Sequence, residues 1–117
     1  MTNLKDFLNS VESGEHEFAG TLDFVAQHYD YRPQAFTNAD LHNAAGQNEG
    51  SCKVLGLAKL EGLSDEQALL AFGEHYRDVL ADSGGEAHGN IRRLMVSGLA
   101  AVAFEELPLR RLQEDAI

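Results

Sequence analysis

The segment from Asn38 to Lys53 is dense in side chains that could bind or transform a small molecule. Amides, an imidazole and a thiol stand among glycines there, and the segment runs directly into an apolar stretch that predicts a helix. Backbone amides at a helix start are unpaired and carry partial positive charge, and glycines let an anion approach them closely. The candidate ligand-binding residues of this segment are His42, Asn43, Asn48, Cys52 and Lys53.

The same segment can also be explained as a loop that satisfies its own backbone. It is not a P-loop, because Gly46 and Gly50 are too close together and Ser51–Lys53 does not reproduce the Gly-Lys-Ser/Thr ending. In this structural interpretation, Asn43 and Asn48 hydrogen-bond buried backbone groups. Replacing Asn43 would then cost stability without removing a functional site.

Cys52 raises the possibility of nucleophilic catalysis, because a thiol near a helix start can have a lowered pKa. His42 and one of the nearby asparagines could complete a Cys–His–Asn set. Cysteine is, however, among the most buried residue types, and buried thiols are usually inert. We therefore expect Cys52 to fill space, and we assign no catalytic residue.

The histidines show no spacing typical of a metal site, since none forms an HxxxH, HxH or HExxH pair. We accordingly assign no metal ligand and no cofactor. The fold could still bring His42, His75 and His88 into one site. The further candidates for polar groups of a ligand site are His75, Tyr76, His88 and Asn90.

Apolar residues recur at helical spacing over most of the chain. This pattern predicts helices at Leu4–Val11, Thr21–Tyr29, Ser51–Glu61, Ser64–Ala81 and His88–Leu99. The third is apolar nearly all round and should be central, and the fourth starts at a capping box formed by Ser64 and Gln67. Arg92 and Arg93 are expected on a solvated helix face.

Two short strands are predicted, at Gln34–Asn38 and Ala101–Leu107, and Gln34–Asn38 is expected to pair with Ala101–Glu106. Between Asn38 and Gly50 we expect an irregular loop, or a short helical turn at Ala39–Asn43 followed by a loop. The final segment RRLQEDAI is expected to fray. The predicted fold is a single α+β domain spanning residues 1–117, predominantly helical, with about five helices packed around a minor short-stranded sheet.

Charge and composition exclude several classes of function. The 117 residues carry a net charge of −10, which opposes binding to nucleic acids and to anionic lipid surfaces. The single cysteine precludes an intramolecular disulfide, and no apolar run approaches the roughly 20 residues that a membrane span needs. The first residues do not resemble a secretory signal peptide.

The runs FTNADLHNAAGQNEGSCK, LAKLEGLSDEQALLAFGEHYRDVL, HGNIRRLM and VAFEELPLR follow one another in this order. Together they resemble the HopJ type III effector family, from about Phe7 to Leu109. The most specific parts are HNAAGQNEGSCK, HYRDVL and HGNIRRLM. The resemblance implies an association with bacterial type III secretion into host cells, and it carries no enzymatic activity or catalytic residue.

Two functional hypotheses follow. In the first, the chain is a type III effector-like interaction module whose surface meets a protein partner. In the second, it is a bacterial cytoplasmic protein that binds a small molecule or anion around His42–Lys53, with or without catalysis. The expected location is thus the bacterial cytoplasm, with secretion by a type III system as the alternative. The sequence predicts no oligomeric state.

Overall fold

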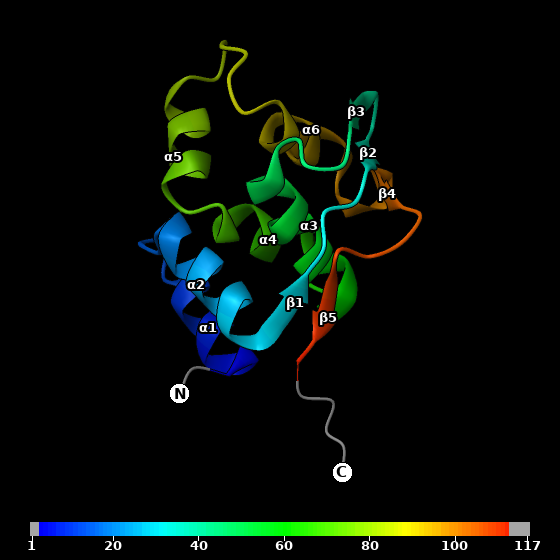
Figure 1. Cartoon of the computed structure of the whole chain (residues 1–117). Coiled ribbons are helices and arrows are strands. Elements are labelled where there is room, and N and C mark those ends of the chain that lie inside the picture. Colours follow the sequence, from blue (N-terminus) through cyan, green and yellow to red (C-terminus); the bar gives the residue numbers. More distant parts are fainter. Residues whose placement is uncertain (1–2, 113–117) are drawn as a thin grey trace.

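The chain folds into six α-helices and two small antiparallel sheets within residues 3–112, the part that the computed structural model describes (Figure 1). The helices are α1 (Leu4–Glu12), α2 (Phe18–His28), α3 (Glu49–Glu61), α4 (Asp65–Ala71), α5 (Glu74–Ala81) and α6 (Gly89–Ser97), and a 3₁₀ turn, η1, spans Leu99–Ala101. The strands are β1 (Tyr29–Tyr31), β2 (Phe36–Asn38), β3 (Leu41–Asn43), β4 (Val102–Phe104) and β5 (Leu109–Arg111). The predicted α+β, mainly helical fold class is confirmed.

Helix α3 forms the centre of the hydrophobic core. Its residues Val54, Leu55 and Leu57 are fully buried, as expected for a helix that is apolar nearly all round. Helices α2 and α4, strand β5 and η1 contact it. Burial of each large aliphatic side chain contributes about 1.5–3 kcal/mol relative to exposure, which makes α3 the main apolar scaffold of the fold.

Helix α2 begins at Phe18, three residues earlier than predicted. The reason is a cap supplied from α5, because the Glu74 carboxylate accepts a hydrogen bond of 2.7 Å from the Phe18 amide. The same hydrogen bond holds the pKa of Glu74 below its usual range. A distant residue therefore satisfies a helix start that has no side-chain cap of its own.

The predicted helix over Ser64–Ala81 is wrong in its extent, because Gly73 divides it into α4 and α5. The predicted capping box is present: Ser64 Oγ accepts from the Gln67 amide and Gln67 Oε1 accepts from the Ser64 amide. At Gly73 the backbone has φ 61° and ψ −129°, a conformation open mainly to glycine. A Cβ there would lie 2.5 Å from the Phe18 amide nitrogen, so the packing of α2 sets the break.

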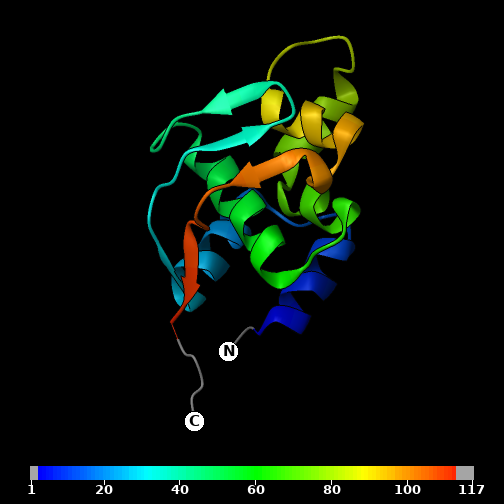
Figure 2. The ribbon, with the colours of Figure 1, turned by 90° about the vertical axis from the view of Figure 1, so that its right-hand side faces the viewer.

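Strands β2, β3 and β4 form a sheet in the order β3-β2-β4, and it lies on one side of α3 together with β5 (Figure 2). The predicted pairing of Gln34–Asn38 with Ala101–Glu106 is confirmed, with Phe36 opposite Phe104. The irregular loop predicted between Asn38 and Gly50 is confirmed only for residues 44–48, and the alternative of a helical turn at Ala39–Asn43 is wrong. A tight turn with φ 54° at Ala39 folds this segment back as β3, which places Asn43 opposite Phe36.

The C-terminal segment is more ordered than predicted as far as residue 112. Arg110 and Arg111 lie in β5, which pairs with β1, instead of fraying. Arg111 donates two hydrogen bonds, of 3.1 and 2.8 Å, to the Glu61 carboxylate, which also accepts one from the Tyr29 hydroxyl. Residues 113–117 of the segment expected to fray lie outside the described residues.

Gly73 provides a direct test of this architecture. We expect Gly73→Ala to lower the free energy of unfolding by about 2–4 kcal/mol, because it adds backbone strain and a clash with the start of α2. Urea denaturation measures this. The matched control is Gly84→Ala in the α5–α6 loop, where an added Cβ meets nothing within 4 Å and little change is expected. Equal stability of the two variants would contradict the explanation.

Candidate functional site

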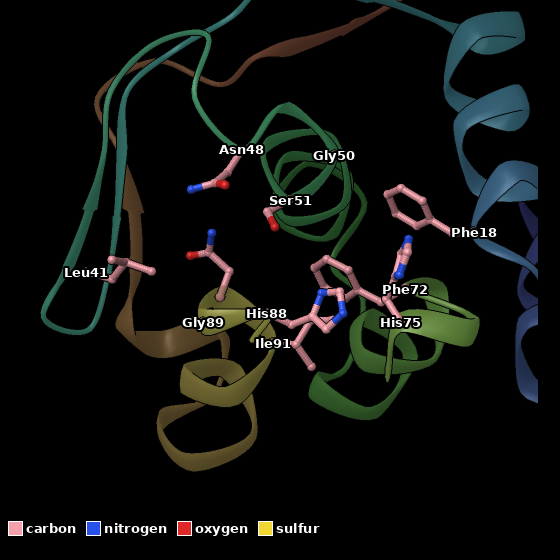
Figure 3. A pocket seen from close by; sticks show the side chains of 11 residues that line it. Phe18, Leu41, Asn48, Gly50, Ser51, Phe72, His75, His88, Gly89 and Ile91 are labelled. Atoms are coloured by element: carbon pink, nitrogen blue, oxygen red, sulfur yellow. The ribbon is translucent and has the colours of Figure 1, made fainter. Parts of the chain in front are cut away.

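A pocket of about 320 Å³ lies between the N-termini of α3 and α6, with α5 and the start of α2 beside it (Figure 3). Apolar walls come from Phe18, Leu41, Phe72 and Ile91. The polar side chains lining it are those of Asn48, Ser51, His75, His88 and Asn90. No carboxylate is among the residues that line this pocket.

Both helix starts at this pocket lack a side-chain cap. Asn48 precedes α3 with φ 51° and ψ 52°, and His88 precedes α6 with φ 59° and ψ 54°, so both residues are left-handed. In this conformation neither side chain caps its own helix, in contrast to Asn3 and Ser64. The amides of the first turns of α3 and α6 consequently have no hydrogen-bond partner among the described residues.

A cluster of asparagines holds the two helix starts in place. Asn43 is fully buried and Asn90 nearly so, and their side chains exchange hydrogen bonds of 3.0 and 3.3 Å. Asn38 donates to the Asn90 carbonyl at 2.9 Å, and Asn48 donates to Asn43 Oδ1 at 2.6 Å. The cluster therefore joins β2, β3 and the first residues of α3 and α6, which supports the structural interpretation of Asn43. The partners of Asn43 and Asn48 are, however, mainly side chains and not the predicted backbone groups.

His75 and His88 lie next to each other at the pocket, with ring centroids 5.1 Å apart (Figure 3). The Phe18 ring makes an edge contact with His75 at 4.8 Å. Asp78 follows His75 by one helical turn, and the donor atoms of His75, Asp78 and His88 all lie within 4.8 Å of one another. Among residues 3–112, these three could hold a metal ion. Asp78 is not among the candidates singled out from the sequence, although its i,i+3 spacing from His75 places both on one helix face.

Arg92 positions the loop that carries His88. Its guanidinium donates to the carbonyls of Asp82, Ser83 and Ala87 at 2.9, 3.3 and 2.6 Å. The expectation of a solvated Arg92–Arg93 face is therefore wrong, because the side chain of Arg92 is only 18% exposed and Arg93 pairs with Asp40 at 2.7 Å. Both arginines bind other segments of the chain.

His42 and Cys52 do not join this pocket. His42 is exposed and lines a different depression, over the three-stranded sheet, together with Phe36 and Phe104. Cys52 is 1% exposed, and its thiol donates to the Gln34 carbonyl at 3.6 Å. Burial raises the pKa of the Cys52 thiol, which opposes thiolate formation. The two residues thus line no common pocket and offer no Cys–His–Asn set.

Three further candidates lie outside the pocket. The Lys53 ammonium lies 4.7 Å from the centre of the Tyr31 ring, in a cation–π contact. Tyr76 is half-buried and packs against the hydrophobic core. Asn43 does not line the pocket, but its side-chain oxygen accepts hydrogen bonds from Asn48 and Asn90. Of the candidate residues singled out from the sequence, four line the pocket: Asn48, His75, His88 and Asn90.

Comparison with known proteins places the whole fold in a family. Residues 4–109 match the family model described as HopJ type III effector protein. The chain belongs to the HopJ family. A crystal structure of a protein of unknown function, VPA0580, is similar to this HopJ family chain with a TM-score of 0.88 and 37% identity over 94% of each chain. No match was found among curated proteins. No helix within residues 3–112 is long and apolar enough to span a membrane.

The asparagine cluster can be tested by mutation. We expect Asn43→Ala to lower the free energy of unfolding by about 1–3 kcal/mol, because it removes the acceptor for the side-chain N–H groups of the buried Asn90 and of Asn48. Thermal or urea unfolding measures the change. Asn9→Ala, at an exposed position of α1, is the matched control and should have little effect. Unchanged unfolding of the Asn43 variant would refute the structural role.

Proposed function

We propose that this HopJ family chain binds a small anionic molecule in the pocket between α3 and α6. The observation that carries the proposal is the meeting of two uncapped helix N-termini at one cavity. Each helix start presents unpaired amides and the positive end of its dipole. A phosphate or carboxylate group is the ligand that satisfies both.

The remaining lining of the pocket suits such a ligand. The Ser51 hydroxyl and the imidazoles of His75 and His88 supply additional donors, and they line the same pocket as the first residues of α3 and α6 (Figure 3). Because the surface as a whole carries net negative charge, long-range attraction cannot steer the anion. Recognition therefore depends on short-range hydrogen bonds within the cavity.

The size of the pocket restricts the ligand. A volume of about 320 Å³ is at the small end of ligand sites in proteins, which run from about 300 to 1,000 Å³. Phe18, Phe72 and Ile91 give one wall an apolar surface. We therefore expect inorganic phosphate or a small carboxylic or phosphorylated metabolite.

A charge placed in the pocket should abolish anion binding. Ser51 is the third residue of α3, where the helix dipole stabilises a glutamate side chain. The Ser51→Glu variant should therefore fold normally. Its carboxylate would occupy the cavity and repel an anion. We expect NMR titration of metal-free protein with phosphate or small carboxylates to shift Gly50, Ser51, Gly89 and Asn90 in the natural chain and not in Ser51→Glu.

The isosteric neutral variant Ser51→Gln is the control for that experiment, since it adds the same bulk without the charge. We expect it to retain weaker binding. Titration shifts scattered over the surface, or equal binding by all three chains, would exclude the pocket as an anion site.

A second candidate function is that of a secreted effector that meets a host protein. The family description supports it, and so do three neighbouring apolar residues exposed on α5 and α6: Leu80, Met95 and Val96, at 54%, 42% and 87%. The two candidates are compatible, because the exposed side chains do not line the α3–α6 pocket.

Export is the measurement that tests this second candidate. Deleting the first residues would be ambiguous, because Phe7 and Val11 of α1 are buried in the core and Phe7 stacks on Phe24. A fusion of residues 1–15 to a reporter enzyme avoids this problem. We expect its secretion by a strain with a functional type III system and retention by a strain lacking one. Retention in both strains would count against the effector role.

A further inference from the structure

The two histidines at the pocket and the carboxylate beside them have the composition of a metal-binding triad. His75 and Asp78 come from consecutive turns of α5, and His88 is the residue before α6. Their donor atoms lie within 4.8 Å of one another, although His88 follows His75 by 13 positions in the sequence. The triad therefore arises from the packing of the α5–α6 loop.

The geometry is close to that of a coordination sphere. Tetrahedral zinc with bonds of about 2.0–2.1 Å holds its ligand atoms about 3.3 Å apart. The donor atoms of the triad must each move by about 1 Å to reach that spacing from their present separations of up to 4.8 Å. Asp78 and His88 are exposed and His75 is half-buried, so rotation of their side chains can supply such movements without disturbing the core.

All three side chains are free to bind. His75, Asp78 and His88 make no side-chain hydrogen bond and no ion pair with any described residue. The neighbouring acidic groups are engaged elsewhere, since Glu74 caps the Phe18 amide and Asp82 lies 3.9 Å from Arg92. Asp78 is thus the carboxylate of α5 that forms no ion pair and no hydrogen bond with a described residue.

The donor set selects the class of metal. Two imidazoles with one carboxylate suit zinc, iron, cobalt and nickel, whereas magnesium and calcium prefer oxygen ligands throughout. We propose that His75, Asp78 and His88 bind one divalent transition-metal ion at the edge of the α3–α6 pocket. Three protein ligands leave at least one coordination position open, as in zinc sites that bind a water or a substrate.

A bound metal would define how the pocket holds its ligand, and this part of the inference rests on the proposed anion-binding function. An anion oxygen can complete the coordination sphere while the amides of α3 and α6 bind the other oxygens. Because the helix N-termini are themselves positive, they oppose a cation alone and favour a cation–anion pair. Metal and anion should therefore strengthen each other's binding, by equal factors in both directions.

Metal binding is tested first without any anion. Untagged, chelator-treated protein is titrated with Zn²⁺ by calorimetry, and with Co²⁺ by visible absorbance, which reports the coordination geometry. We expect one metal per chain. Asp78→Asn, His75→Gln and His88→Asn should each weaken zinc binding by about tenfold or more. Asparagine at position 88 tolerates the left-handed backbone of that residue, so the fold should survive.

His42→Gln is the matched control, because His42 is an exposed histidine outside the triad, and it should bind zinc like the natural chain. Mg²⁺ in excess should not displace zinc. A chain carrying both His75→Gln and His88→Asn that binds zinc as tightly as the natural protein would overturn the proposal. Failure of the natural chain to bind a stoichiometric zinc would do the same.

A second titration separates this proposal from the anion site. Phosphate should raise the affinity for zinc in the natural chain. Zinc binding that phosphate does not alter would uphold the metal site and reject its coupling to the anion pocket. Phosphate binding to the metal-free chain, without any zinc binding, would uphold the anion site and reject the metal.

Discussion

The hydrogen-bonded amide pair of Asn43 and Asn90 is the constraint on which the candidate site depends. Two buried carboxamides are costly unless each finds partners of good geometry, and here each donates to the other. The pairing fixes the β2–β3 hairpin against the start of α6, and Asn48 extends it to the start of α3. A hydrogen-bonded polar network of this kind specifies one arrangement, whereas apolar packing tolerates several. The relative position of the two helix N-termini follows from it.

The same network explains why those helix starts remain open. Asn48 is a residue type that commonly caps helices, yet its side chain bonds to Asn43 and not to its own helix. A side-chain cap is worth about 1 kcal/mol, so the arrangement gives up local stability at α3. Departures from local consistency of this kind are typical of functional sites. The residues at both helix starts also line the pocket, which joins the structural role of the asparagines to the proposed binding role.

Membership of the HopJ family bears on where the protein acts, whereas the pocket bears on what it binds. The family description concerns delivery by type III secretion, and the similar structure of VPA0580, a protein of unknown function, shows that the fold is shared over nearly the whole chain. Neither assigns a chemical activity. The pocket supplies a chemical hypothesis of its own: two helix dipoles and two imidazoles suited to an anion, with a carboxylate beside the imidazoles that completes a metal triad. Buried Phe7 and Val11 show that α1 also belongs to the folded core.

Local patterns in the sequence determined the fold class, the central helix α3 and the capping box at Ser64, because periodicity and capping act over a few residues. The two strand patterns also indicated the pairing of β2 with β4, although these strands are far apart in the sequence. Residue types also singled out Asn48, His75, His88 and Asn90 as polar candidates. Only the tertiary structure decided the break at Gly73, because a Cβ there would clash with the distant start of α2. It also decided the β3 strand and the inward role of Arg92, which rest on hydrogen bonds to β2 and to the α5–α6 loop that the apolar periodicity did not indicate. It likewise separated His42 and Cys52 from the pocket and added Asp78. A binding site is a set of distances between residues far apart in sequence, and local propensity does not encode those distances.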